Sequence, residues 1–179
     1  MFAKISKFKF LLSISAILAL PLITPAQLPI MIYHAHENLN YDEDAFREQM
    51  DFLVANDFTT ITPDQFLEWR LHDKPLPLRP VLLTVDDNYI RVYTSMYPIL
   101  KERDQVITNF TITGMVGYQN GLHYCDWDEL REMEDSGAVI SESHTRTHPE
   151  LTTLSPQEEW NELKGSKEAL EANLTEKQS

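Results

Sequence analysis

The fold is decided by residues 81–89, which read VLLTVDDNY. Val81 to Val85 is a short apolar run and predicts a strand that ends at Asp86 and Asp87. Two adjacent carboxylates at the end of an apolar strand are costly unless a cation or hydrogen-bond donors hold them. One could bind a metal ion while its neighbour transfers a proton, or Asp86 to Asn88 could form an ordinary polar turn.

Strands and helices alternate on both sides of this stretch. Further strands are predicted over residues 28–33, 58–61, 106–113 and 138–141, the first of them buried. Helices are predicted over residues 42–57, 62–69, 89–103, 126–136 and 155–172, with an interruption at Pro98. About five βα units in succession predict an α/β fold with parallel strands and helices outside them.

Polar residues follow three of the predicted strands directly. In parallel α/β proteins, the carboxyl ends of the strands form the rim where binding sites are built. His144 and His148, four residues apart, can meet at one metal ion if their segment is helical or tightly turned. With one Asp they would leave positions open for water and substrate, as a catalytic metal site requires. They could instead be surface histidines in a loop.

A second pair of histidines, His34 and His36, ends the first strand. A histidine at this position could act as a general acid, because imidazole titrates near neutral pH. It could equally cap the strand or bond to the backbone. The sequence does not choose between the two residues.

The composition excludes several classes of protein. The 179 residues carry 15 Lys and Arg against 28 Asp and Glu, a formal net charge of −13. A nucleic-acid binder needs a basic surface to neutralise phosphates, so that class is disfavoured. The one cysteine, Cys125, cannot form an internal disulfide, and the length fits one domain.

Residues 1–26 have the pattern of an export signal. Lys4, Lys7 and Lys9 precede an apolar run over residues 10–23, which is short for a membrane span of about 20 residues. Small residues at Thr24 and Ala26 suit a cleavage site. We therefore expect a signal peptide over residues 1–26, a single domain over 27–179 and a secreted, periplasmic or cell-envelope location. An uncleaved N-terminal anchor is the alternative.

The chain resembles the polysaccharide deacetylases, the NodB-homology or carbohydrate esterase family 4 group. Within that group it looks closest to the secreted enzymes that act on poly-N-acetylglucosamine. The family's T-F-D-D-G motif is similar to residues 84–88, and its H-[ST]-x-x-H motif is similar to residues 144–148. Further similar stretches are residues 29–34, 97–101, 127–133 and 136–137.

The resemblance implies a fold, an activity and a set of site residues. The fold would be a deformed (β/α)7 barrel. Asp87, His144 and His148 would bind a divalent metal, usually zinc and sometimes cobalt or nickel. Asp86 would be the general base, and His34 would protonate the departing amine. The substrate would be an N-acetylglucosamine polymer, and the products would be acetate and a glucosamine unit.

The chain departs from the family pattern at three points. Val85 replaces the family's Phe and Asn88 its Gly, although Asn tolerates positive φ better than most residues. The family's aromatic-Pro-Tyr-Gly strand, with its Arg and Asp partners, does not follow the last predicted helix. We therefore expect an incomplete barrel of about five βα units and weak or absent activity of this chain alone. The alternatives are an inactive carbohydrate-binding remnant and a related esterase acting on peptidoglycan or acetylated xylan.

Overall fold

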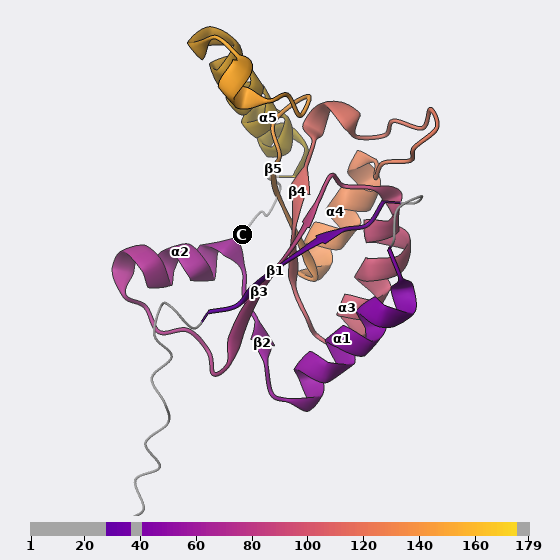
Figure 1. Ribbon diagram of the computed structural model, residues 1–179, viewed down its shortest axis with the longest axis vertical. Coiled ribbons are helices and arrows are strands. Elements are labelled where there is room, and N and C mark those ends of the chain that lie inside the picture. Colours follow the sequence, from indigo (N-terminus) through magenta and orange to yellow (C-terminus); the bar gives the residue numbers. More distant parts are fainter. Residues whose placement is uncertain (1–27, 37–40, 175–179) are drawn as a thin grey trace, which may run out of the picture.

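The computed structural model describes residues 28–36 and 41–174, and the predicted signal peptide lies outside these residues. Strands and helices alternate along the described chain (Figure 1). The strands are β1 (Ile30–His34), β2 (Thr59–Thr60), β3 (Pro80–Asp86), β4 (Ile107–Thr111) and β5 (Val139–Ser143). The α-helices are α1 (Glu43–Ala55), α2 (Pro63–His72), α3 (Tyr97–Glu102), α4 (Trp127–Ser136) and α5 (Pro156–Leu174). Single turns are η2 (Val92–Met96), η3 (Thr113–Met115) and η4 (Leu151–Thr153).

The strands form one parallel sheet in the order β1-β3-β4-β5, and β2 pairs with the first two residues of β3. The register places His34 of β1 opposite Asp86 of β3, and Asp86 opposite Phe110 of β4. Phe110 in turn lies opposite Glu142 of β5. Because paired residues of a sheet share a face, these four side chains lie on one face at the carboxyl-end rim.

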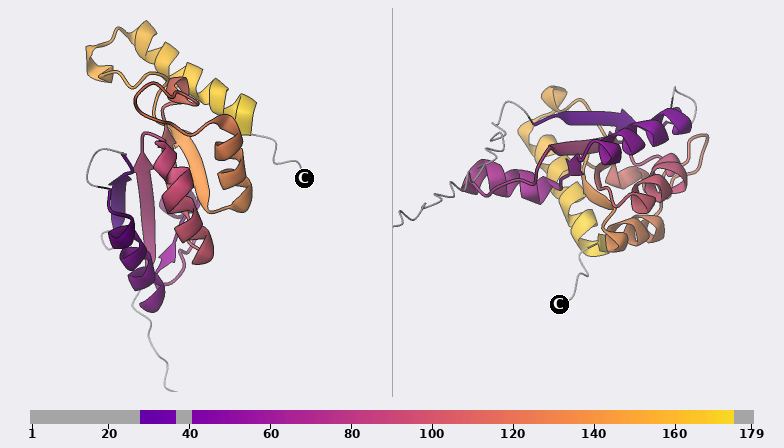
Figure 2. Two further views of the ribbon diagram at one scale, coloured as in Figure 1. Left: turned by 90° about the vertical axis from the view of Figure 1, so that its right-hand side faces the viewer. Right: turned by 90° about the horizontal axis from the view of Figure 1, so that it is seen from below.

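Helices cover the two faces of the sheet unequally. α1, α3 and α4 pack on one face, α2 lies on the other, and α5 crosses beside β5 at the rim (Figures 1 and 2). The core lies under the three-helix layer, where Met50, Leu83, Leu100, Leu130 and Val139 are fully buried. No residue of α2 is buried. The part of the sheet that carries the polar rim is therefore packed against a buried helix layer on one face only.

Local sequence signals set the helix ends. The Asp42 carboxylate caps α1 by accepting from the N–H groups of residues 44 and 45. Asp126 and Glu129 form a reciprocal capping box at α4, and Gly137 ends that helix with φ of 76°. Ser155 immediately precedes α5, and its N–H and hydroxyl both donate to the carboxylate of Glu158. Each of these ends is thus fixed by residues close to it in sequence.

The predicted interruption near Pro98 takes the form of a wider helical turn. Residues Val92–Met96 form the π-helical turn η2, in which the N–H of Tyr97 bonds to the carbonyl of Val92. Pro98 then lies in the first turn of α3. Proline has no N–H to donate to residue 94, so the helix can widen at this point without losing a bond from that position.

The predicted burial of the first strand is wrong. Ile30 is 53% exposed and Ile32 is 65% exposed. Both are on the face of β1 that turns away from α1, and β1 is the edge strand of the described sheet. Only the alternate residues Met31 and Tyr33 pack against the core. Two smaller differences are that α2 continues to His72 and that β4 ends at Thr111, before the predicted end at residue 113.

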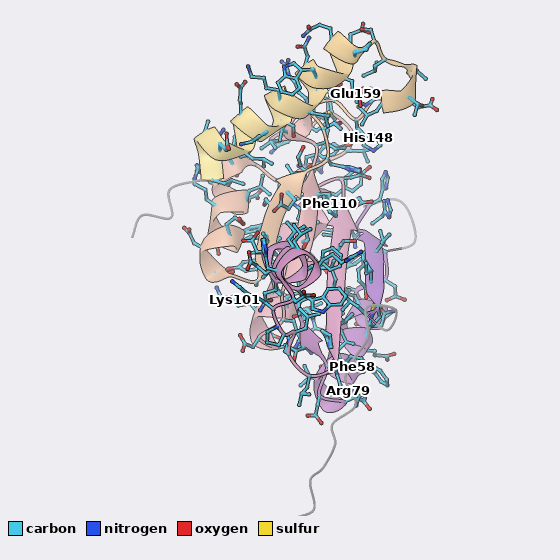
Figure 3. All side chains as sticks on the ribbon, turned by 90° about the vertical axis from the view of Figure 1, so that its left-hand side faces the viewer. Phe58, Arg79, Lys101, Phe110, His148 and Glu159 are labelled. Carbon is cyan, nitrogen blue, oxygen red and sulfur yellow. The ribbon has the colours of Figure 1, made fainter. Side chains whose placement is uncertain are left out.

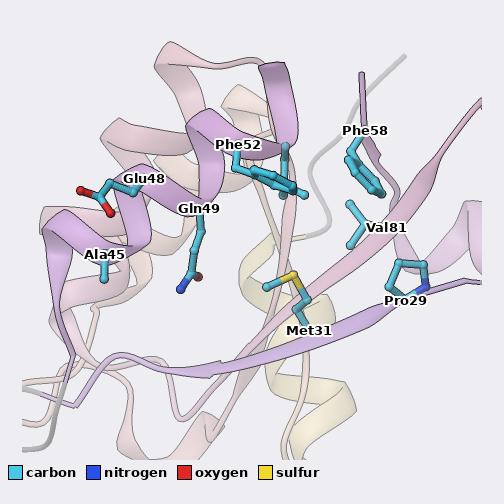
Figure 4. Close-up of a pocket in the computed structure, with 9 residues that line it drawn as sticks. Pro29, Met31, Ala45, Glu48, Gln49, Phe52, Phe58 and Val81 are labelled. Carbon is cyan, nitrogen blue, oxygen red and sulfur yellow. The ribbon is translucent and has the colours of Figure 1, made fainter. Parts of the chain in front are cut away.

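None of the helices described over residues 28–36 and 41–174 is long and apolar enough to cross a bilayer. A cavity of about 490 Å³ opens between α1 and the amino-terminal halves of β1 and β3. Its walls include Met31, Phe52, Phe58 and Val81 (Figure 4). It lies at the opposite end of the strands from the polar rim and contains none of the predicted site residues.

Candidate metal centre

The two carboxylates at the end of β3 are followed by a left-handed turn. Asp87 has φ of 78° and Asn88 has φ of 43°. The expectation that Asn88 accepts positive φ is thus confirmed. Asn88 is fully buried, and its Oδ1 accepts a hydrogen bond of 2.9 Å from the N–H of Ile112. Its carbonyl accepts another from the N–H of Cys125. Glycine could supply the backbone conformation but not the side-chain bond to Ile112.

His144 and His148 lie in a tight loop rather than a helix, here called the histidine loop (residues 144–148). Thr145 and His148 have φ of 64° and 58°. The Thr145 hydroxyl accepts from the N–H of His148 at 3.0 Å, which closes the turn. The two imidazole ring centroids are consequently 4.6 Å apart. The tightly turned alternative for this segment is confirmed.

The segment around η3 holds one side of the histidine loop. The N–H of Thr113 bonds to the carbonyl of Thr145, and the N–H of Gly114 bonds to the carbonyl of Arg146 at 2.7 Å. A Cβ atom on Gly114 would lie only 2.5 Å from that carbonyl oxygen. Glycine is therefore required at residue 114 for this approach. His148 lies in the same upper region as Phe110, whereas Phe58 and Arg79 lie at the other end of the sheet (Figure 3).

The structure brings Asp87, His144 and His148 together. One ligand atom from each lies within 4.8 Å of the others, and His144 Nε2 is 3.6 Å from Asp87 Oδ1. Two ligands of a tetrahedral zinc ion at about 2.1 Å lie roughly 3.4 Å apart. Burial lowers the pKa of His144, with the nearby carboxylates opposing the effect. Lowering favours neutral imidazole, which is the form that binds metal. The donor set and its spacing fit a divalent cation.

His34 and Asp86 form a second pair beside these ligands. His34 Nε2 lies 3.5 Å from Asp86 Oδ2, and the two side chains are 58% and 20% exposed. The ring of His36 instead lies 4.7 Å from that of Tyr89. Of the two histidines that the sequence left open, His34 is therefore the one placed to exchange a proton next to Asp86.

Sequence reasoning missed two residues at the site. Tyr89 is 9% exposed, and its pKa is raised far above the usual value by burial, by Tyr124 and by the negative charge of Asp87. It remains a neutral phenol, which can donate a hydrogen bond beside Asp87. Its position two residues after that carboxylate was the available signal. Glu162 of α5 contacts the histidine loop, and nothing in the spacing of an amphipathic helix marks it.

Comparison with known proteins identifies the family of the chain. The family model described as polysaccharide deacetylase matches residues 73–179. The chain belongs to this family. A Bacillus subtilis (strain 168) protein, YxkH, which carries a provisional polysaccharide deacetylase name, is 34% identical over 146 residues. A Staphylococcus aureus poly-β-1,6-N-acetyl-D-glucosamine N-deacetylase is 33% identical over 111 residues.

The match covers different shares of the two chains in each pair. It covers 80% of this deacetylase-family chain and 51% of YxkH, and 61% of this chain and 38% of the Staphylococcus aureus protein. This chain thus spans about half or less of the curated relatives that it matches.

Solved structures share the fold. The Streptococcus pyogenes deacetylase PplD, in complex with acetate, has a TM-score of 0.75 and 28% identity, over 82% of this chain and 69% of that one. IcaB from Ammonifex degensii has a TM-score of 0.69 and 24% identity, over 82% and 69% of the two chains. The predicted α/β fold of the deacetylase family is confirmed.

Proposed function

We propose that this chain removes N-acetyl groups from an N-acetylglucosamine-containing polysaccharide by metal-dependent hydrolysis. The observation that carries the proposal is the adjacency of two sets of groups at one rim. Asp87, His144 and His148 can bind a cation, and Asp86 with His34 can move protons beside it. The Staphylococcus aureus relative, whose name gives a poly-N-acetylglucosamine substrate, supports the substrate class.

Zinc is the proposed metal, with cobalt or nickel as alternatives. Two imidazole nitrogens and one carboxylate oxygen form a common catalytic zinc ligand set that leaves coordination positions open. When bound, the cation would supply a Lewis acid that polarises the acetamide carbonyl and makes a water molecule easier to deprotonate. Asp87 would also lower the net positive charge of the centre.

The proton transfers fall to Asp86 and His34. Asp86 would accept a proton from the attacking water while the water oxygen bonds to the carbonyl carbon. The C–N bond then breaks, and protonated His34 would donate its proton to the leaving nitrogen. One water and one acetamide thus give acetate and a free amine, and acetate is the molecule bound in the solved PplD structure.

The substrate side of the rim is open in this chain. Ile32, on the same face as His34, is 65% exposed, so this face would leave a bound acetamide in contact with water. Electrostatic catalysis is weaker where water screens the reacting groups. We therefore propose that this chain alone is a weak deacetylase.

We also propose that the protein is exported through residues 1–26 and works in the cell envelope or outside the cell. The three lysines followed by an apolar run support this. Mass spectrometry of the protein recovered from envelope and medium fractions tests it. A product that begins near Gln27 is expected, and full-length protein confined to the cytosol would contradict the proposal.

Acetate release from a β-1,6-linked N-acetylglucosamine oligomer tests the main proposal. We expect slow, zinc-dependent release that a chelator stops and that Asp87→Ala abolishes. Polymer binding without zinc or turnover would favour the carbohydrate-binding remnant. Release from acetylated xylan or peptidoglycan alone would favour the esterase.

A further inference from the structure

Helix α5 contacts the histidine loop on the side opposite η3. The Oε2 atom of Glu162 accepts hydrogen bonds from the N–H of Arg146 at 3.0 Å and the N–H of Thr147 at 2.7 Å. Its Oε1 atom accepts from the Thr147 hydroxyl at 2.8 Å. One carboxylate therefore accepts from three donors, which belong to Arg146 and Thr147, two of the three residues between His144 and His148. Hydrogen bonds to a carboxylate are among the stronger ones in proteins.

A second contact lies one helical turn further along α5. The hydroxyl of Ser166, which is fully buried, lies 2.8 Å from that of Ser143 at the end of β5. Ser143 in turn accepts from the N–H of Thr145 at 3.2 Å. Between these contacts, a Cβ atom on Gly165 would be 3.4 Å from the Arg146 side chain. α5 thus contacts both the end of β5 and the middle of the histidine loop.

The loop conformation needs such support. Two of its residues, Thr145 and His148, have positive φ, a conformation that costs non-glycine residues energy and persists where surrounding contacts fix it. The N–H groups of Arg146 and Thr147 bond to Glu162 rather than to a helix or strand. Arg146 and Thr147 are exposed, so without this acceptor their N–H groups would bond to water and the loop would lose its tie to α5.

We propose that Glu162 is a positioning residue that holds the histidine loop in the conformation in which His144 and His148 meet beside Asp87. The importance of this arrangement for catalysis rests on the proposed function. The positioning itself does not, because it can be measured in the metal-free chain. Glu162 acts through the backbone of Arg146 and Thr147, two of the three residues between the histidines.

The test compares Glu162→Gln with the matched control Glu159→Gln. Glu159 is an exposed residue of the same helix, so the control makes the same change of charge and side chain away from the loop. The first readout is hydrogen exchange of the Arg146 and Thr147 amides in the metal-free chain. The second is zinc affinity by chelator competition, and the third is the visible spectrum of the cobalt-loaded chain, which reports ligand geometry.

We expect Glu162→Gln to speed exchange of both amides at least about tenfold, because the neutral amide oxygen of glutamine is a weaker acceptor than a carboxylate oxygen and its NH2 group cannot accept from the Thr147 hydroxyl. Zinc affinity should fall roughly 10- to 100-fold, the usual range when the groups that support metal ligands are lost, and the cobalt spectrum should change. Circular dichroism should stay the same, and Glu159→Gln should match the wild type in every readout.

A milder variant, Thr147→Val, removes the hydroxyl donor and keeps the side-chain shape. It should weaken zinc binding in the wild-type background but add little in Glu162→Gln, because the two groups act together. Unchanged amide exchange in Glu162→Gln, or zinc affinity within twofold of wild type, would overturn the positioning role. A third outcome separates the two proposals. If the wild type binds no zinc, but the Arg146 and Thr147 amides exchange faster in Glu162→Gln than in the wild type, the positioning role stands and the proposed function fails.

Discussion

Removing one predicted ligand should abolish tight zinc binding without unfolding the chain. We consider His144→Ala, because His144 lies within reach of both other ligands: its Nε2 is 3.6 Å from Asp87 Oδ1 and its ring is 4.6 Å from that of His148. Structural zinc sites bind with about 10–16 kcal/mol shared among four ligands, or roughly 3 kcal/mol each. A loss of about 3 kcal/mol corresponds to roughly 150-fold weaker binding.

The metal-free variant should fold almost as well as the wild type. The lowered pKa of His144 arises first from burial and then from the two neighbouring histidines, with Asp86 and Asp87 opposing it. Burial therefore disfavours the protonated imidazole, so removing the ring takes away this cost before metal binds. His144 is also 29% exposed, so its truncation leaves an opening to solvent rather than a closed cavity.

Zinc titration and thermal melting on the same samples provide the assay. Zinc at 100 times its dissociation constant stabilises a protein by about 2.7 kcal/mol, or roughly 5–10 °C for a domain of this size. That shift should appear in the wild type and in the control His72→Ala, whose exposed side chain lies on α2, and should vanish in His144→Ala. Equal zinc affinity in His144→Ala, or a folded wild type that binds no zinc, would refute the reasoning.

Three further outcomes follow from other contacts. Asp86→Asn should lower acetate release by about 10²–10⁴-fold while zinc affinity changes less than threefold, and a parallel loss of zinc would make Asp86 a ligand instead. Asn88→Gly should lower the urea-measured free energy of unfolding by about 1 kcal/mol, because the Ile112 N–H loses its acceptor; no change would mean that water replaces the side chain. Burial raises the pKa of Tyr33 to about 12 from an ordinary 10.0, so its contribution to stability is complete below pH 10 and is lost as pH rises toward 12. Tyr33→Phe should flatten that loss, and an unchanged alkaline profile would contradict it.

The sequence predicts features that a few neighbouring residues control. The capping box at Asp126, the left-handed Gly137 and the start of α5 at Ser155 all depend on contacts within four residues. The order of strands and helices follows from the same kind of local pattern, and parallel strands place their carboxyl ends at one rim. The candidate ligands could therefore be named before their distances were known.

Features set by tertiary packing could not be predicted in this way. The apolar pattern of β1 does not show that it is an edge strand, so the exposure of Ile30 and Ile32 was missed. Glu162 lies 14 residues after His148 in sequence, and only the packing of α5 on the histidine loop brings its carboxylate there. The residue types at the end of the first strand did not choose between His34 and His36, whereas the register of β1 against β3 places His34 opposite Asp86, in agreement with the family resemblance.

The backbone turn after β3 explains how two adjacent carboxylates can serve one site. In a regular strand, successive side chains point to opposite faces, so Asp87 would face the helix layer if Asp86 faced the rim with His34. The positive φ of Asp87 and Asn88 breaks this alternation. The Asp87 carboxylate comes within 3.6 Å of His144 while Asp86 stays 3.5 Å from His34. The Asn88 side chain fixes this turn by accepting a hydrogen bond from the N–H of Ile112, the residue after β4. The separation of a metal ligand from a proton acceptor at neighbouring positions thus depends on the turn, and the strand alone would not produce it.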